Sequence, residues 1–314
     1  MNRILNALSV DVEDYFQVSA FSATIPLSSW DDYACRIERN TVRLLDLFER
    51  RGVHATFFVL GWIATRYPQV VREIHRRGHE VASHGHAHRT LDQMTAPAFR
   101  EEVRGDKTLL EDLIQAPVLG YRAPSFSITR RTMWALDILC EEGYRYDSSV
   151  FPVHHDRYGI PDAPRFPHDL AFNGRTLREF PPSTVSLFGL PNVPIGGGGY
   201  LRLYPLWVTR WGLRRINERE RQPALVYCHP WEVDPEQPRV PASRLARWRH
   251  YINLETTERR LDRLLGEFRF APIRTVLQLG PGIGGERRTV EAAAVVEGGT
   301  GDRGYGEGSV VGMG

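Results

Sequence analysis

The chain alternates stretches that have the pattern of β-strands with stretches that have the pattern of α-helices. Leu5–Val12 is a short apolar run, and His54–Leu60 is rich in aromatic and β-branched residues, as strands are. Between them, Cys35–Arg51 carries apolar residues at helical spacing and is followed by Gly52, a typical helix end. Because repeated β-then-α units favour a parallel sheet with helical crossovers, we expect an α/β fold.

The same alternation continues along most of the chain. Further strands are expected at Glu80–Ser83, Val118–Tyr121, Tyr144–Asp147, Arg175–Phe180, Ala224–Cys228 and Phe270–Val276. Further helices are expected at Ala64–Arg77, Thr95–Gln115, Thr129–Glu142, Pro205–Arg221 and Arg244–Phe268. The segment Phe151–Gly199 is rich in Pro and Gly, and we expect a long irregular excursion there.

Composition limits the folded part and the class of partner. Apolar residues make up 42% of the chain and charged residues 25%, as in ordinary globular domains. The last 34 residues hold 11 of the 28 glycines, so we expect residues 281–314 to be a disordered tail. A net charge of +2 argues against a nucleic-acid binder. Without a long apolar run or a recognisable signal peptide, we predict a cytoplasmic protein, with association at the inner membrane face as an alternative.

Three histidines follow the expected strand at Glu80–Ser83. On a helical turn, a spacing of four residues places His84 and His88 on one face, as a metal site needs. His86 faces elsewhere in a helical conformation and is expected to line the site. A chance pair of histidines is the alternative explanation for the spacing.

Three carboxylates stand at the end of the first strand. Asp11, Glu13 and Asp14 repel one another unless a positive group lies among them. Two histidines and one carboxylate, with positions open for water, match a catalytic zinc or related metal site. If strand geometry persists, Asp11 and Glu13 point to the same side, whereas a strand that stops at Val12 lets Asp14 turn inward. A solvated acidic strand end is the alternative.

Polar residues also follow the other expected strands. Arg122 can pin a carboxylate with paired hydrogen bonds, and Pro124 would fix its loop. Asp147 can orient a histidine, and His229 is a candidate proton shuttle. Trp231, beside His229, is singled out for stacking on a sugar ring, with a place in the core as the alternative. In barrels of this class, strand carboxyl ends form the face that carries the chemistry.

Taken in order, these clusters resemble the polysaccharide deacetylase family, the NodB-homology group of carbohydrate esterase family 4, over roughly residues 5–232. The second to fifth motifs of that family are matched by His84 and His88, by Arg122 and Pro124, by Asp147, and by His229. The widespread first motif has two adjacent aspartates, but here Val12 follows Asp11. This departure leaves the third metal ligand open between Glu13 and Asp14.

The resemblance implies a deformed (β/α) barrel and removal of N-acetyl groups from amino sugars. Residues 1–232 would form the catalytic domain, residues 233–280 a C-terminal extension packed on the barrel, and residues 281–314 the tail. Sequence details further resemble a subfamily from bacterial exopolysaccharide loci of the exosortase (PEP-CTERM) type. The implied partners are an N-acetylated oligo- or polysaccharide and a polysaccharide assembly complex.

The resemblance also implies residue roles. A divalent metal ion, Zn first and Co, Ni or Fe as options, would be held by His84, His88 and one of the two candidate carboxylates. Asp11, held by Arg122, would be the base, and His229, oriented by Asp147, the acid. A backbone N–H near Ser125 or Phe126 would stabilise the oxyanion, and substrate contacts fall on Pro124, Ser125, Phe126 and Trp231. Hydrolysis of a small non-sugar amide and an inactive carbohydrate-binding protein are the competing hypotheses.

Overall fold

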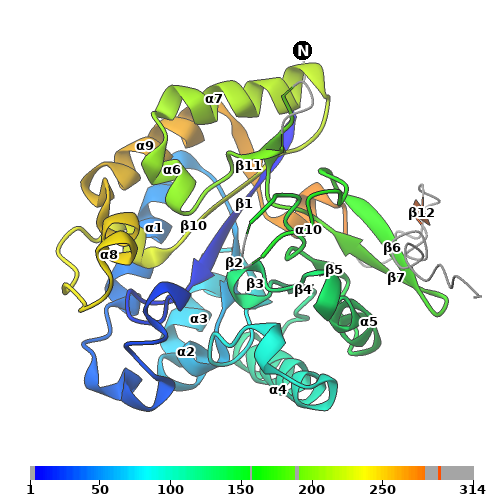
Figure 1. Ribbon diagram of the computed structural model, residues 1–314, viewed down its shortest axis with the longest axis horizontal. Coiled ribbons are helices and arrows are strands. Elements are labelled where there is room, and N and C mark those ends of the chain that lie inside the picture. Colours follow the sequence, from blue (N-terminus) through cyan, green and yellow to red (C-terminus); the bar gives the residue numbers. More distant parts are fainter. Residues whose placement is uncertain (1–3, 156–157, 188–190, 280–288, 291–314) are drawn as a thin grey trace, which may run out of the picture.

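A computed structural model describes residues 4–155, 158–187, 191–279 and 289–290 of the chain (Figure 1). Its strands are β1 (Leu5–Val12), β2 (Thr56–Val59), β3 (Glu80–Ser83), β4 (Gly120–Tyr121), β5 (Tyr146–Asp147), β6 (His168–Phe172), β7 (Arg175–Glu179), β8 (Thr184–Val185), β9 (Val193–Pro194), β10 (Leu225–Cys228), β11 (Arg269–Ala271) and β12 (Thr289–Val290). Apart from β12, the expected Gly-rich tail lies outside the described residues.

Helices connect most of these strands. The α-helices are α1 (Ile37–Arg51), α2 (Gly61–Arg66), α3 (Pro68–Arg76), α4 (Ala96–Ile114), α5 (Trp134–Glu141), α6 (Gly199–Leu203), α7 (Leu206–Arg214), α8 (Arg244–Tyr251), α9 (Leu254–Glu267) and α10 (Ile273–Val276). Short 3-10 turns include η1 (Ser19–Phe21), η4 (Pro124–Phe126) and η7 (Pro230–Val233). No helix of the described ranges is long and apolar enough to cross a membrane.

The main sheet is parallel from β10 through β7, in the order β10-β1-β2-β3-β4-β5-β7-β6-β12, and β11 pairs with the first half of β1. Its register aligns the strand carboxyl ends: Ser83 lies opposite Tyr121, and Tyr121 lies opposite Asp147. The residues that follow each strand therefore emerge at one edge. The expected α/β fold with a parallel sheet is confirmed.

The sheet curves around a small inner cluster. Side chains from strands far apart in the order, Ala7 of β1, Tyr146 of β5 and Leu225 of β10, belong to one buried group that Ile273 of α10 joins. The outer face is covered by a ring of helices in which α9, α1, α3, α4 and α5 each pack against the next (Figure 1). This curvature brings the two halves of the chain to the same site.

Three expected elements differ from the structure for local reasons. The helix expected at 64–77 is divided into α2 and α3 because Pro68 disfavours helical geometry at Tyr67. The helix expected at 244–268 is broken at Asn253, whose φ is 54°. The strand expected at 270–276 ends after β11, and α10 begins beyond Pro272.

The excursion between residues 151 and 199 is more ordered than expected, because β6 and β7 form an antiparallel hairpin within it. The loop of residues 196–199, which we call the Gly-rich loop, follows β9 and pairs with the backbone of β10. Tyr227 N–H donates to Gly196 O at 2.8 Å, and Gly198 N–H donates to Tyr227 O at 3.1 Å. Gly197 has a φ of 150°, and a Cβ there would lie 2.0 Å from Tyr227 O. The glycines therefore allow close backbone approach behind the strand that leads to His229.

Candidate metal and acid–base site

Three side chains at the carboxyl edge form a compact group of metal-binding type. Glu13, His84 and His88 each offer one ligand atom, and these atoms lie within 4.8 Å of one another. Glu13 Oε2 is 2.7 Å from His88 Nε2. The two histidines meet through a loop rather than through the helical turn we expected, because Gly85 (φ 72°) and His88 (φ 51°) both adopt left-handed geometry.

The fit of this group to a cation rests on the chemistry of its donor atoms. His84 Nδ1 lies 2.7 Å from the carbonyl oxygen of Arg122, which can only accept, so Nδ1 donates and Nε2 keeps its lone pair. Burial lowers the pKa of His84 to about 4, so its ring is neutral at pH 7. Glu13 Oε2 is buried without a well-oriented hydrogen bond. Two imidazole nitrogens and one carboxylate suit zinc and related divalent ions.

Asp14, the other candidate for third ligand, is turned away from this group. The strand stops at Val12, yet it is Glu13 that faces the histidines. Asp14 accepts hydrogen bonds from the backbone N–H of Tyr15 at 2.8 Å and from that of Arg36. The structure therefore separates the two carboxylates that the sequence left equivalent.

Arg122 holds Asp11 in a fully buried arrangement. Its Nη1 donates to Asp11 Oδ1 at 2.6 Å and to Ser9 Oγ at 2.8 Å. Nε and Nη2 donate to the carbonyl and the hydroxyl of Ser148, at 3.1 and 2.9 Å. The guanidinium lies 4.2 Å from the ring centroid of Phe58. With its donors directed by four contacts, Arg122 fixes one oxygen of Asp11 and leaves the other facing the site.

That second oxygen faces His229. Asp11 Oδ2 is 3.9 Å from His229 Nε2, which is also 3.5 Å from Glu13 Oε1. On its other side, His229 Nδ1 lies 3.2 Å from Glu232 Oε2. Burial alone would lower the pKa of His229, but the charge and hydrogen bond of Glu232, together with the charges of Glu13 and Asp11, outweigh it and raise the pKa to about 9. A protonated imidazole is thus held between the site and a buried carboxylate.

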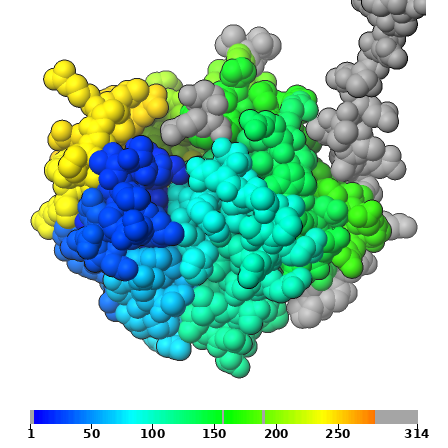
Figure 2. All heavy atoms as spheres, turned by 60° about the horizontal axis from the view of Figure 1, so that its bottom comes forward, coloured from blue at the N-terminus to red at the C-terminus, as the bar shows by residue number. Residues whose placement is uncertain are grey.

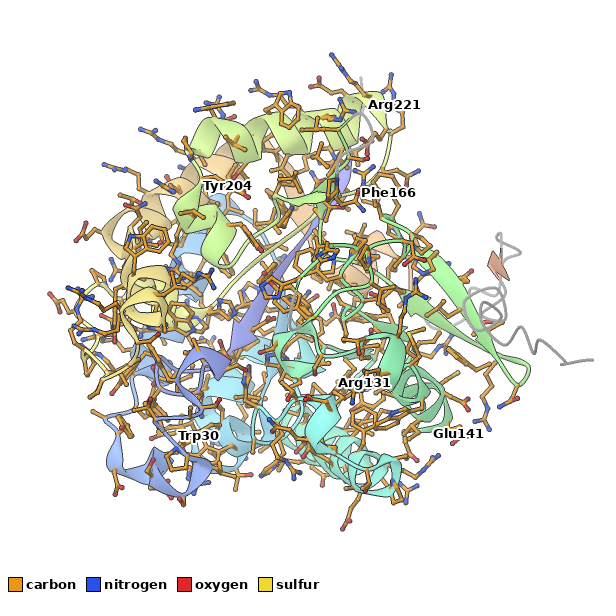
Figure 3. All side chains as sticks on the ribbon, viewed as in Figure 1. Trp30, Arg131, Glu141, Phe166, Tyr204 and Arg221 are labelled. Carbon is orange, nitrogen blue, oxygen red and sulfur yellow. The ribbon has the colours of Figure 1, made fainter. Side chains whose placement is uncertain are left out.

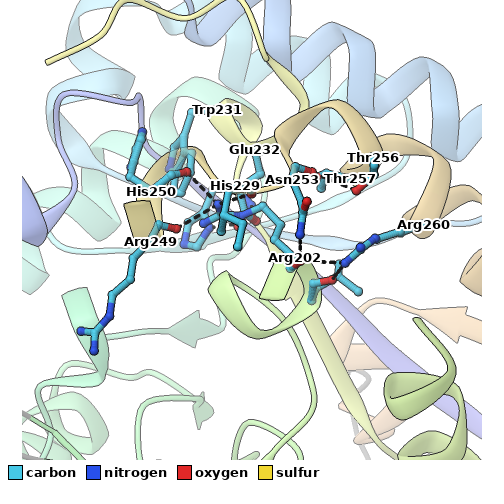
Figure 4. A network of polar contacts seen from close by, with 12 residues as sticks. Arg202, His229, Trp231, Glu232, Arg249, His250, Asn253, Thr256, Thr257 and Arg260 are labelled. Atoms are coloured by element: carbon cyan, nitrogen blue, oxygen red, sulfur yellow. Dashed lines mark hydrogen bonds and ion pairs between the residues drawn. The ribbon is translucent and has the colours of Figure 1, made fainter. Parts of the chain in front are cut away.

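Glu232 is anchored by the segments around α8 and α9 (Figure 4). Arg202 Nε donates to Glu232 Oε1 at 2.7 Å, and both side chains are buried. Arg202 Nη1 donates in turn to the carbonyls of Arg249, His250 and Ile252, at 3.1, 2.7 and 3.1 Å. Although burial raises the pKa of Glu232, Arg202 and then His229 bring it down to about 2.

Asp147, which we expected to orient His229, has other partners. Its carboxylate accepts from the backbone N–H and the hydroxyl of Ser149, at 2.9 and 2.6 Å, and it interacts with the buried Glu179. Burial raises the pKa of both carboxyl groups. The charge of Asp147 raises the pKa of Glu179 further, while a hydrogen bond with Glu179 lowers that of Asp147. Ser149 Oγ also accepts from Ala123 N–H at 2.7 Å. Asp147 thus supports the loop that carries Arg122, and Glu232 occupies the place expected for it.

The expected substrate contacts divide in a similar way. Trp231 is buried, stacks nearly parallel with His229 and His250 at 5.2 and 4.2 Å, and donates from Nε1 to Glu13 Oε1 at 3.2 Å. It contacts Glu13, a candidate ligand, and offers no open ring face, contrary to the expected stacking on a sugar. Pro124 and Phe126 are buried as well.

Ser125, the remaining expected substrate contact, lines an open groove of about 570 Å³ beside His88. The groove is lined mainly by polar side chains, among them Ser19, Ser22, Thr90, Gln93, Ser125 and Thr129. Arg131, labelled in Figure 3, also lines it, as does Tyr158, which stacks on His155 at 3.8 Å. A polar groove with an aromatic ring suits a hydroxylated ligand.

Sequence reasoning missed several residues of the site. Ser19 Oγ bridges His88 Nδ1 and Ser125 Oγ, at 3.3 and 2.5 Å, from a turn without any motif. Arg202 belongs to no sequence motif, and its ion-pair partner Glu232 lies 30 residues further along the chain. Glu232 itself could have been found, because it lies three residues after His229 at the start of a 3-10 turn.

His86 points away from the metal-binding group. Its Nδ1 lies 2.8 Å from Asp106 Oδ1, and hydrogen bonding to that carboxylate raises its pKa. It is half-exposed beside the loop that carries the two other histidines.

Comparison with protein families divides the chain near β5. Residues 24–146 match the family model "Polysaccharide deacetylase", and residues 148–278 match a "Domain of unknown function (DUF3473)". The candidate metal ligands His84 and His88 fall in the first match, and His229 falls in the second.

Curated relatives agree with the first match. A peptidoglycan deacetylase of Helicobacter pylori is 31% identical over 114 residues, which are 36% of this chain and 37% of that protein. A chitooligosaccharide deacetylase of Rhizobium leguminosarum bv. trifolii is 30% identical over 115 residues, which are 36% of this chain and 49% of that protein. The chain therefore spans less than half the length of either relative.

Solved structures share the fold over a longer stretch. A protein of Mycobacterium smegmatis assigned as a polysaccharide deacetylase aligns over 92% of this chain and 95% of its own, with 20% identity and a TM-score of 0.56. One of Pseudomonas aeruginosa PAO1 aligns over 88% and 90%, with 16% identity and a TM-score of 0.59. The chain carries a polysaccharide deacetylase domain of the NodB-homology, carbohydrate esterase family 4 type, followed by a DUF3473 region.

Proposed function

We propose that this protein is a metal-dependent hydrolase that removes N-acetyl groups from the amino sugars of a polysaccharide or of its oligosaccharide precursor. The observation that carries the proposal is the Glu13, His84 and His88 group beside two acid–base side chains, Asp11 and His229. Amide hydrolysis needs an activated water, a stabilised oxyanion and a proton for the leaving amine. Each need has a candidate group within one edge of the sheet.

A divalent cation held by Glu13, His84 and His88 would polarise the acetyl carbonyl and lower the pKa of a water molecule. Asp11 would accept the proton of that water through Oδ2, because Oδ1 is already taken by Arg122. Ser125 N–H is the proposed donor to the oxyanion, since Phe126 N–H already donates to Ala123 O at 3.0 Å. Losing one such donor typically costs about 3–4 kcal/mol of transition-state stabilisation.

His229 would protonate the nitrogen of the leaving amine as the C–N bond breaks. Its Nε2 is on the side of Asp11 and Glu13, and its Nδ1 is held by Glu232. The overall reaction consumes one water and releases acetate and a free amino sugar. Zinc is the metal we propose, on the grounds of the donor set.

A role in exopolysaccharide biosynthesis, at the cytoplasmic side and in contact with an assembly complex, is part of the same proposal and rests on the resemblance of the sequence motifs. The polar groove beside His88 and Ser125 supports a saccharide substrate. The names of the two curated relatives support the same class of substrate.

The test is acetate release from a panel of N-acetylated oligosaccharides, with metal content measured on the same sample. We expect His84→Ala to lose metal and activity together. Retained metal without acetate release from any N-acetylhexosamine oligomer would contradict the proposal. Faster turnover of acyclic amides than of sugars would favour a small-amide hydrolase instead.

A further inference from the structure

In the part of the chain that the structure describes, the exposed large apolar side chains come mostly from three successive helices. Of the six in the described ranges, five come from α6, α7 and α8: Leu203, Trp207, Trp211, Leu245 and Trp248. We call this the α6–α8 surface. Trp207 is 66% exposed, and Leu245 and Trp248 are 56% and 51% exposed. Such exposure of tryptophan and leucine marks an interaction surface rather than the edge of a core.

In Figure 1, α7 runs across the top of the molecule, α6 lies below it and α8 lies at the left, and α6 packs against α8. In Figure 2 the yellow segment that contains α8 stands at the periphery. Trp207 and Trp211 are four residues apart on α7 and therefore share a helix face.

This part of the chain is also strongly basic. Residues 199–251 contain ten arginines and five acidic residues, whereas the whole chain has a net charge of +2. Residues 237–251 contain four arginines and no acidic residue. The side chains of Arg244, Arg247 and Arg249 have no acidic partner among the residues that the structure describes. Figure 4 shows Arg249 extending away from the network that its own backbone joins.

We propose that the α6–α8 surface docks on the headgroup region of an anionic phospholipid bilayer. Indole rings favour the membrane interface, where one part of the ring is apolar and the N–H is hydrated. Arginines on the same surface pair with phosphate groups and anionic headgroups. Tryptophan and leucine beside basic residues are the composition of segments that lie in the interface without spanning the bilayer.

Two other occupants fit less well. A symmetric contact with a second copy would place the same patch on both sides and bring Arg244, Arg247 and Arg249 of one copy against those of the other. A soluble anionic glycan would satisfy the arginines and could stack on the tryptophans, but it would leave Leu245 in water. Only a surface with both negative charge and an apolar layer uses every member of the patch.

The proposal has a consequence for the groove beside His88. Phe21 packs on His250 of α8 at 4.7 Å between ring centroids, and its neighbours Ser19 and Ser22 line the groove. Docking through α8 would therefore hold the groove close to the bilayer. This gives the protein access to saccharides attached to lipid, in addition to those in solution.

The experiment is co-sedimentation of the full chain with phosphatidylcholine vesicles that contain or lack phosphatidylglycerol. We expect binding to the anionic vesicles, little binding to the neutral ones, and loss of binding at high salt. Replacing two of these arginines together (Arg244→Gln and Arg247→Gln) should weaken partitioning at least about tenfold. Arg249 is left in place because its carbonyl accepts a hydrogen bond from Arg202. The paired apolar changes Leu245→Ala and Trp248→Ala should weaken it as well.

Matched controls exist elsewhere on the chain. Leu27→Ala removes the remaining exposed large apolar side chain of the described ranges, and Arg72→Gln with Arg145→Gln changes the charge equally at other exposed positions. Both controls should bind like the wild type. Acetate release from a soluble oligosaccharide should be unchanged in all these variants, which separates docking from catalysis.

Three results would overturn the proposal. The first is that the wild type binds neutral and anionic vesicles equally, and that the arginine variant binds both as the wild type does. The second is binding to a soluble polyanion, such as alginate, that the apolar changes do not weaken. The third is a patch-dependent dimer in sedimentation equilibrium that fails to bind vesicles.

Discussion

The two halves of the chain build the same site in different ways. The half from β1 to β5 places Asp11, Glu13, His84 and Arg122 at, or directly after, the carboxyl ends of parallel strands whose register aligns them. The half from residue 148 onward contributes His229 after β10, but it holds that side chain through Glu232 and Arg202. Strand ends suffice for the first half, whereas the second depends on an ion pair between distant segments.

The two halves differ in how far apart in the sequence the residues that position each site side chain lie. In the first half, each site residue is positioned by its own strand and by a neighbouring strand. In the second half, Arg202 depends on three carbonyls that lie 47 to 50 residues further along the chain. We infer that changes in the first half act on metal and base directly, while changes in the second act on the orientation of the acid.

The largest expected effect on activity comes from replacing Glu13, the proposed third metal ligand. Glu13→Ala should lose bound metal and all measurable acetate release, since it removes the carboxylate nearest His88. Asp14→Ala should keep the metal and lose stability instead, because two backbone N–H groups lose their acceptor. Metal content and thermal unfolding of both variants check this. Metal loss in the Asp14 variant with metal retained in the Glu13 variant would reverse the assignment.

Next comes the proposed base. Asp11→Asn should lower acetate release by about 10²–10⁴-fold while metal content stays at the wild-type level. An amide keeps the shape of the side chain but cannot accept the proton of a water. The measurement is the rate per bound metal ion. If the variant is stripped of metal, Asp11 is a ligand and not the base.

A smaller effect is expected from the second half. Glu232→Gln should lower kcat about 10–100-fold with little change in KM or metal content, because His229 loses the charge that holds it. Asp147→Asn is the matched control, and its effect on kcat should be smaller, since Asp147 contacts Ser149 and Glu179 instead of His229. The comparison between the halves fails if the Asp147 variant is the more impaired of the two.

The smallest effect on catalysis, but a clear one on stability, is expected behind β10. Gly197→Ala should destabilise the fold by about 2–3 kcal/mol, because its Cβ would meet Tyr227 O and its φ is positive. Gly199→Ala, with open space around its Cβ, should change stability by less than about 1 kcal/mol. Denaturant unfolding of the two variants provides the measurement, and equal stability would mean that the Gly-rich loop does not pack on β10.

The sequence predicts the half from β1 to β5 better than the half from residue 148 onward. The periodicity of apolar residues predicts β1 and β3 with the bounds observed, and motif order predicts which residues stand at the sheet edge. Neither pattern tells whether Glu13 or Asp14 faces the histidines, because that depends on where the backbone turns after Val12. The sequence predicts Asp147 as the partner of His229, whereas the observed partner, Glu232, comes from the turn after β10. The division of the chain at residue 232 stays a prediction.

The most direct test of the central claim is a metal titration of the metal-free chain, with acetate release from an N-acetylated chitooligosaccharide measured at each step. Our account predicts that activity rises with added zinc and saturates at one ion per chain, and that His84→Ala shows neither binding nor activity. Acetate release that is independent of bound metal, or full occupancy of the site without any acetate release, would contradict it.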